Sequence, residues 1–167
     1  MNTAADDVQA RIAAFLAGHT TLTLATVGPD GAPAAAAVFY AHDDALNLYF
    51  LTEERTLHGQ NLLAHAQTAG AIQADGQDWR AICGAQVSGR AVPVTGSELA
   101  HAAIVYGRKY AFVAGLLAGS SGPGVLVGPL AKARFWVLRP AWFRLIDNTV
   151  RFGFKEEWRA DHATESD

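Results

Sequence analysis

The sequence is poor in cysteine and in charged residues, and both shortages exclude classes of protein. Its one cysteine, Cys83, cannot form a disulfide within the chain, so we expect a protein of the reducing cytoplasm. Charged residues make up 17% of the chain, the 13 basic ones are scattered without a run of three, and the formal net charge is −3. Because binding to nucleic-acid phosphates depends on clustered cations, we expect no nucleic-acid partner.

The sequence also lacks the features of an exported or membrane-spanning chain. Near the N-terminus Asp6 and Asp7 stand where a signal peptide carries cations. Residues 110–131 hold no charge and are long enough to span a bilayer. Residues 119–124, GSSGPG, would break such a helix and leave backbone groups unpaired in lipid. We therefore expect no contact with a membrane.

Hydrophobic residues are plentiful and make up 50% of the 167 residues. A chain of this length buries roughly 70% of its surface on folding, which is enough for one core. Because no repeat and no shift in composition divides the chain, we expect a single domain over residues 1–158. Residues 159–167 are polar and terminal, and we expect them to form a disordered tail.

The spacing of hydrophobic residues predicts short strands with helices outside them. Helices are expected over residues 4–17, 57–66 and 98–117. Strands are expected over residues 20–27, 34–40, 46–51, 68–74, 81–94, 133–138, 143–146 and 150–154. A capping box at Thr95–Glu98 begins the third helix, and the chain from Glu156 is expected to fray. Short turns make neighbouring strands antiparallel, so the fold class is mainly β, a small antiparallel barrel with flanking helices.

A cluster of polar residues stands between the strand at 46–51 and the helix at 57–66. A helix N-terminus offers unpaired N–H groups and the positive end of a dipole, so it can hold a phosphate. The candidate binding residues are Thr52, Arg55, Thr56, His58 and Asn61. In the alternative interpretation Thr56 only caps the helix, Arg55 is solvated and Asn61 packs in the interior. Glu53 and Glu54 oppose an anion unless they point away.

Two further segments carry candidate residues. Gly84 and Gly89 inside a strand mark a bulge or the close approach of something flat, and Gln86 could hydrogen-bond the edge of an amide-like ring. In the alternative interpretation these glycines only let a small barrel bend. Residues 144–154, with Asn148 in the turn, are typical of a hairpin. The histidines lie far apart and the common nucleophile, metal and nucleotide motifs are missing, so no metal site and no catalytic residue is assigned.

Taken in order, these segments resemble the pyridoxamine 5′-phosphate oxidase-like superfamily of FMN-binding split barrels. The resemblance runs from about residue 8 to residue 158, through R-T-L-H-G-Q-N-L from Arg55, G-x-Q-x-x-G-R-A from Gly84 and D-N-T…F-G-F from Asp147. The last motif is similar to that of a small, poorly characterised bacterial branch. The resemblance implies a six-stranded antiparallel split β-barrel that forms a homodimer, with two flavin sites at the subunit interface.

The resemblance also implies where a cofactor lies. In such proteins the FMN phosphate lies by the residues that match Thr52, Thr56 and His58. Residues near Gln86 lie by the isoalloxazine ring. The segment 33–40, PAAAAVFY, departs from the family, because flavin-binding members usually carry an arginine and a lysine there. The phosphate would then rest on Arg55, His58, backbone N–H groups and an arginine of a second subunit.

Three functions are consistent with these residues. The leading hypothesis is a homodimeric, FMN-dependent oxidoreductase that acts on a small molecule. The spacing of His58 and Asn61 also occurs in the haem-utilisation branch of the same fold, so the second is a non-enzymatic module that binds haem or another flat ligand. The third is an apo structural dimer without a phosphate site. Dimerisation is also expected, because the aromatic residues near the end of the chain exceed what one small barrel can enclose: Phe135, Trp136, Trp142 and Phe143.

Overall fold

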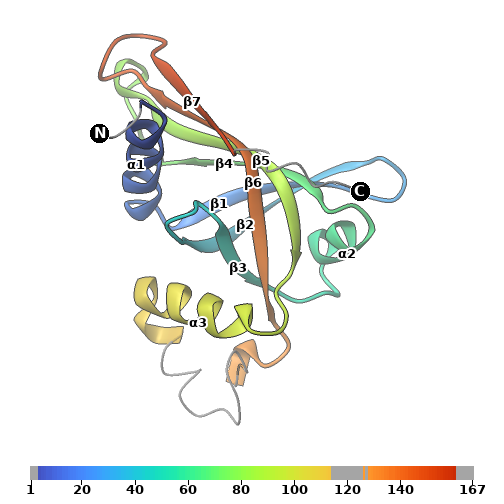
Figure 1. The fold of residues 1–167 in the computed structure, drawn as a ribbon. Helices are drawn as coiled ribbons and strands as arrows, with labels where there is room; N and C mark the ends of the chain where they lie inside the picture. Colours follow the sequence, from blue (N-terminus) through green and yellow to red (C-terminus); the bar gives the residue numbers. More distant parts are fainter. Residues whose placement is uncertain (1–3, 114–125, 127, 161–167) are drawn as a thin grey trace, which may run out of the picture.

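The structure, a computed structural model, describes residues 4–113, 126 and 128–160. In this part of the chain one antiparallel sheet has the strand order β3-β2-β1-β4-β5-β6-β7, and β3 also pairs with β6. The second pairing closes β1 to β6 into the predicted six-stranded barrel, and β7 extends the sheet beyond β6 (Figure 1). The strands are β1 Thr21–Val27, β2 Pro33–His42, β3 Leu48–Thr52, β4 Gln67–Gln73, β5 Cys83–Pro93, β6 Arg134–Asp147 and β7 Lys155–Arg159.

The alternation of side chains along each strand separates the barrel interior from its outer face. In β1, Leu22 and Leu24 are buried, whereas Thr23 and Ala25 are exposed. The buried side chains of all six barrel strands join in one core cluster. This is the physical basis of the alternating pattern that located most of the strands in the sequence.

Three helices of the described chain lie against the barrel: α1 Ala4–Ala17, α2 Leu57–Ala64 and α3 Glu98–Lys109. The described chain also contains two short 3₁₀ helices, η1 Trp79–Ala81 and η2 Gly128–Leu130. The helix α1 inserts Ile12 and Leu16 into the barrel core. The helix α3 lies outside the barrel (Figure 1). Its residues Ala102 and Tyr106 belong to a second cluster, which includes Tyr49 and Phe135. The barrel therefore has two apolar layers, one inside it and one beneath α3.

The C-terminal hairpin differs from the prediction. The expected strand over residues 150–154 is mostly turn, and the returning strand is β7. The expectation that the chain frays from Glu156 is therefore wrong. Of the expected disordered tail, Arg159 ends β7, whereas residues 161–167 lie outside the described part of the chain.

The loop before β7 explains this difference. Asn148 Oδ1 accepts a hydrogen bond of 2.9 Å from the Gly153 backbone N–H, and Gly153 has a φ of 72°, which favours glycine. The apolar residues at 150–154, whose pattern resembles a strand, therefore lie in the loop. In β7, Trp158 packs on Phe143 of β6 with 6.2 Å between ring centroids.

Two other predictions about secondary structure are wrong. The segments at 133–138 and 143–146 belong to one strand, β6. The capping box does not form, because Ser97 is the N-cap without a side-chain bond and Glu98 accepts hydrogen bonds from Arg139 instead. Of the helix expected to about residue 117, α3 ends at Lys109, residues 111–113 are helical again after Tyr110, and residues 114–117 lie outside the described part.

The aromatic residues near the end of the chain do not support dimerisation in the way expected. Phe135, Trp136 and Phe143 are all 0% exposed within a single chain. One chain encloses them because β6 passes both apolar layers, so Phe135 faces α3 while Trp136 and Phe143 face the barrel interior.

The uncharged segment at 110–131 lies mostly outside the described residues, including its GSSGPG run at 119–124. Among the helices that the structure does describe, none is long and apolar enough to cross a membrane. Tyr110, at the start of the segment, is buried and donates a hydrogen bond of 2.6 Å to the Tyr40 carbonyl.

Candidate functional site

A pocket of about 360 Å³ lies among α3, β2, the end of β3 and the start of α2. Most of its wall is apolar and includes the rings of Phe39, Tyr106 and Phe112. The end of β3 and the first turn of α2 add two polar side chains, Thr52 and His58. The pocket thus joins an aromatic wall to part of the polar cluster that the sequence singles out.

Thr52 and His58 form a hydrogen-bonded pair in the pocket wall. Thr52 Oγ1 lies 2.6 Å from His58 Nε2 and 3.2 Å from Thr56 Oγ1. Burial lowers the pKa of His58 below its ordinary value, because water solvates the charged imidazolium less well there. His58 is therefore neutral near pH 7, and the cluster offers hydrogen bonds rather than charge.

Thr56 caps α2, as predicted. Its Oγ1 accepts a hydrogen bond from Gly59 N at 3.1 Å and donates one to the Glu53 carbonyl at 2.8 Å. A Cβ on Gly59 would lie 2.5 Å from that carbonyl oxygen, so only glycine lets the chain fold back this closely. The cap fixes the first turn of α2, and with it His58, beside the end of β3.

The arginines near this cluster are paired with carboxylates. The exposed Arg55 side chain forms an ion pair with Glu53. Arg134, which lies opposite Thr52 in the β3–β6 ladder, forms an ion pair with Glu54. The sequence did not identify Arg134, because only the closure of the barrel brings it to this place. These two pairs leave no excess positive charge beside Thr52.

Asn61 lies inside the fold and does not line the pocket. It is 2% exposed, and its Nδ2 donates a hydrogen bond of 3.0 Å to Thr26 Oγ1 of β1. This position corresponds to the alternative interpretation, in which Asn61 packs in the interior. Its contact joins α2 to the barrel.

Gln86 is exposed on the outer face of β5 and lies apart from Thr52 and His58. Cross-strand pairing places Ala37, Thr23, Ala71 and Gln86 in one row over β2, β1, β4 and β5. Three strand spacings along this row correspond to about 14 Å. Ala37 lines the pocket, whereas Gln86 lines another hollow beside Cys83. A single chain therefore does not bring Gln86 to the pocket.

The glycines on either side of Gln86 differ in their surroundings. Gly89 lies at an irregularity of the β5–β6 ladder, where a Cβ would lie 2.0 Å from the Arg139 carbonyl oxygen. A Cβ on Gly84 would lie 3.3 Å from the Ile72 carbonyl oxygen. The predicted bulge is therefore found at Gly89, where the tight neighbour is the backbone of β6.

The sequence model of the pyridoxamine 5′-phosphate oxidase family matches residues 8–146. The chain belongs to this family. A UPF0306 protein of Klebsiella pneumoniae is 30% identical over 128 residues, which cover 76% of this chain and 77% of that protein. The predicted resemblance to a poorly characterised bacterial branch is thus confirmed.

Solved structures share the fold of this chain. A haem-binding protein from Mycobacterium smegmatis superposes with a TM-score of 0.68 at 22% identity, and the match covers 95% of this chain and 59% of that protein. HutZ, a haem storage protein from Vibrio cholerae, gives a TM-score of 0.62 at 17% identity over 78% of this chain and 88% of its own. At these identities the likeness is one of fold.

Within this oxidase-family barrel, the aromatic wall is the part of the pocket that sequence reasoning missed. Phe39 comes from the strand noted for its lack of cations, and Tyr106 and Phe112 come from α3 and the residues after it. Nothing in their local sequence distinguishes them from core residues. Only the packing of α3 on the outside of the barrel turns them toward Thr52 and His58.

Proposed function

We propose that this protein binds a flat, conjugated cofactor, first of all FMN, at Thr52 and His58 and performs redox chemistry on a small molecule. The observation that carries the proposal is a pocket that combines an aromatic wall with hydrogen-bonding groups at the start of a helix. Sites for small ligands commonly join apolar walls to a few fixed polar groups. FMN would supply electron or hydride transfer, while the chain orients it and limits the access of water.

The ring system of a flavin suits the apolar side of the pocket. Phe39 is 55% exposed and Phe112 is 61% exposed, although both line the pocket. Contact with a planar conjugated ring would remove these aromatic surfaces from water and add stacking interactions. This supports a flat ligand over a compact, strongly polar one.

The hydrogen bonds around Thr52 determine which nitrogen of His58 is available. Thr56 donates its only hydroxyl proton to the Glu53 carbonyl, so Thr52 is the donor in its contact with Thr56. Thr52 Oγ1 then accepts a hydrogen bond from His58 Nε2–H. The other nitrogen, Nδ1, keeps its lone pair and can accept a hydrogen bond from a ribityl hydroxyl or a ring N–H.

The pocket offers fewer suitable groups for the phosphate of FMN than for its ring system. In the described chain β2 offers the pocket Ala37, Val38 and Phe39, and no cation. Arg55 and Arg134 are the nearest candidates, and binding would require each to exchange its carboxylate partner for the phosphate. Exposed ion pairs contribute little to stability, so this exchange loses little, and a phosphate offers both arginines bidentate geometry.

We further propose that the working form is a homodimer. The side chains on the outer face of β2, β1 and β4 are small in two adjacent rows. Five of them are exposed and Ala71 is partly buried: Ala37, Thr23, Ala71, Ala35, Ala25 and Ala69. A flat face of this kind permits close packing by a second copy, and Gln86 continues the first row. A second copy across this face would bring its own Gln86 toward the pocket, which one chain cannot do.

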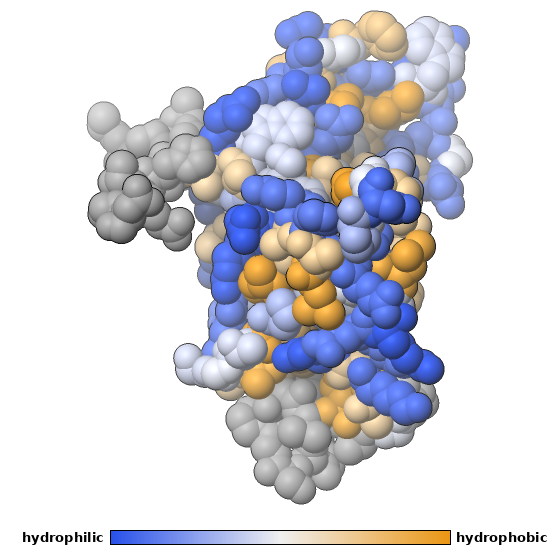
Figure 2. Space-filling model, turned by 90° about the vertical axis from the view of Figure 1, so that its right-hand side faces the viewer, coloured by the Kyte–Doolittle hydropathy of each residue, from blue (hydrophilic) through white to orange (hydrophobic). Residues whose placement is uncertain are grey.

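Exposed apolar side chains beside this face support the same proposal. Figure 2 views the side of the molecule that carries α2, where hydrophobic surface appears in patches between hydrophilic ones. The large exposed hydrophobic residues of β1 and α2 are Val27 at 42%, Leu57 at 67% and Leu63 at 54% exposure. Patches of this kind commonly mark sites of association.

Haem is the second candidate ligand. The observation that favours it is the free Nδ1 of a neutral, half-buried His58 beside an aromatic wall, since neutral imidazole is a common ligand of haem iron. Both solved structures described above are, by their descriptions, haem proteins of the same fold. No change in architecture would be required.

One experiment separates these ligands. Purified protein is incubated with FMN and, separately, with haemin, freed of excess ligand by gel filtration, and examined by absorption spectroscopy and light scattering. FMN that co-elutes with a dimer supports the leading proposal, and a retained Soret band without flavin supports the haem alternative. Retention of neither ligand contradicts both. Thr23→Lys is expected to give a monomer, whereas Ala10→Lys on α1 serves as a matched control.

A further inference from the structure

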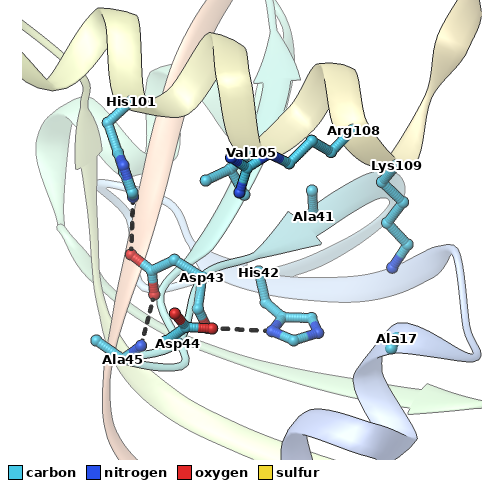
Figure 3. A pocket seen from close by; sticks show the side chains of 10 residues that line it. All are labelled: Ala17, Ala41, His42, Asp43, Asp44, Ala45, His101, Val105, Arg108 and Lys109. Atoms are coloured by element: carbon cyan, nitrogen blue, oxygen red, sulfur yellow. Dashed lines mark hydrogen bonds and ion pairs between the residues drawn. The ribbon is translucent and has the colours of Figure 1, made fainter.

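A second pocket, of about 510 Å³, lies on the other side of α3 from the one at Thr52 and His58. It is bounded by α3, the end of α1 and the turn between β2 and β3 (Figure 3). Its lining includes charges of both signs, with Arg108 and Lys109 on α3 and Asp43 and Asp44 on the turn. None of these residues belongs to the site proposed above.

The carboxylate of Asp43 already takes part in hydrogen bonds with the turn and its neighbours. Its Oδ1 accepts hydrogen bonds from the backbone of Ala45 at 3.1 Å and of Asn47 at 2.9 Å. Its Oδ2 lies 3.2 Å from the Tyr49 hydroxyl and 3.3 Å from His101 Nε2. Asp43 therefore holds the turn against β3 and α3 and is not available to a ligand.

Lys109 is also occupied. Its Nζ donates hydrogen bonds to the carbonyls of Leu16 at 3.0 Å and His19 at 2.5 Å, and it lies 4.2 Å from the centre of the Tyr40 ring. These contacts tie the end of α1 to α3. The ammonium adds positive potential to the pocket but has few donors left for a ligand.

Three other polar groups of the pocket are available to a ligand. Among the described residues, the Arg108 guanidinium and the Asp44 carboxylate have no hydrogen-bond or ion-pair partner, and they stand on opposite walls. His42 Nδ1 lies 3.1 Å from the Asp43 carbonyl oxygen, which can only accept, so Nδ1 carries the proton. In neutral His42 the other nitrogen, Nε2, is then an acceptor.

The hydrogen-bond acceptors and the donor lie on different walls of the pocket. The turn offers acceptors, Asp44 and His42 Nε2, which suit an ammonium group, and α3 offers the Arg108 guanidinium, which suits a carboxylate. Small apolar residues make up much of the remaining lining: Ala17, Ala41, Ala45 and Val105. No group of three or more potential metal ligands is found in the described chain, so a metal ion does not explain the arrangement.

We propose that this pocket binds a small zwitterion, an amino acid whose ammonium contacts Asp44 and His42 and whose carboxylate contacts Arg108. A short apolar spacer between the two charges of the ligand would lie against the small apolar residues of the pocket lining. A ligand with only one of the charges would leave the opposite wall unpaired. The proposal does not depend on flavin or haem binding, because the two pockets share no lining residue.

The test is a calorimetric titration with linear amino acids of increasing spacer length: glycine, β-alanine, γ-aminobutyrate and δ-aminovalerate. Saturable binding of at least one of them is expected, with butyrate and butylamine failing to bind. Arg108→Gln and Asp44→Asn are each expected to weaken binding about tenfold or more. Arg90→Gln and Asp75→Asn, which change exposed residues elsewhere, are the matched controls and are expected to bind as wild type.

Binding that depends on both Arg108 and Asp44 and survives His58→Ala supports the proposal independently of the cofactor site. Failure of all four amino acids to bind overturns it. Equal affinity in wild type and Arg108→Gln also overturns it, because the carboxylate would then lie elsewhere. Circular dichroism of each variant confirms that a loss of binding is not a loss of folding.

Discussion

Asn61 of α2 donates its side-chain amide to Thr26 Oγ1 of β1 across 3.0 Å, in a place where both side chains are almost fully buried. The bond fixes the helix that carries His58 to the wall of the barrel. A buried polar pair of this kind acts on stability first and on ligand binding only through the position of the helix.

We expect Asn61→Ala to lower the free energy of unfolding by about 1–3 kcal/mol, because the Thr26 hydroxyl loses its partner in the interior. Gln60→Ala, an exposed neighbour on the same helix, is the control and should change it by less than about 0.5 kcal/mol. Urea denaturation measures both, and a double-mutant cycle with Thr26→Ala isolates the pair. Equal stability of the two variants would contradict a structural role for Asn61.

The two glycines of β5 should respond differently to an added methyl group. Gly89→Ala would place Cβ 2.0 Å from the Arg139 carbonyl oxygen, so the β5–β6 ladder would have to shift. We expect a loss of about 2 kcal/mol or more in unfolding free energy. Gly84→Ala meets its nearest atom at 3.3 Å and should cost less than about 1 kcal/mol. Thermal unfolding of both variants checks this, and a tolerated Gly89→Ala would contradict the close approach.

Lys109 should make stability depend on pH. Burial lowers its pKa from 10.5 to about 8, so between these values the unfolded chain binds the proton more tightly than the folded one. The stability of wild type relative to Lys109→Met should therefore rise as pH increases from about 8 toward 10. Urea denaturation across this range measures the difference. The same comparison with Lys155→Met, an exposed lysine of β7, should give a flat difference, and a flat Lys109 curve would contradict the prediction.

The glutamates beside the proposed phosphate site should weaken FMN binding. Glu53→Gln and Glu54→Gln release Arg55 and Arg134 from their carboxylates, and we expect each to tighten FMN binding roughly two- to fivefold at low salt. Riboflavin, which lacks the phosphate, is the matched ligand and should bind the variants and wild type alike. Fluorescence titration measures both ligands. An equal gain for riboflavin would mean that the charges do not act on the phosphate.

The strands that alternate buried and exposed residues could be predicted from the sequence, because that pattern follows directly from the two faces of a sheet. The C-terminal hairpin shows where this fails. Val150 and Phe152 resemble strand residues but lie exposed in a loop at 58% and 72%, whereas β7 contains little besides Trp158 to signal a buried face. Side chains in the loop, above all Asn148, decide the register, and such contacts are not visible as a hydrophobic pattern.

The candidate site was predictable only as far as it is contiguous in sequence. Thr52, Thr56 and His58 come together because a strand end and a capped helix follow each other directly. Arg134 and Tyr106 reach the same place only through barrel closure and the packing of α3. The arginine that the sequence did suggest, Arg55, is held by its neighbour Glu53, a choice of partner that spacing does not determine.

The most direct test of the proposed function is a fluorescence titration of FMN with wild type, His58→Ala and His65→Ala. Both histidines lie at α2, but His58 lines the pocket and His65 is exposed at the far end of the helix. Saturable quenching by wild type and His65→Ala, with binding about tenfold weaker or worse in His58→Ala, is the predicted result. Equal affinity in all three proteins, or no binding by wild type, would contradict a flavin site at Thr52 and His58.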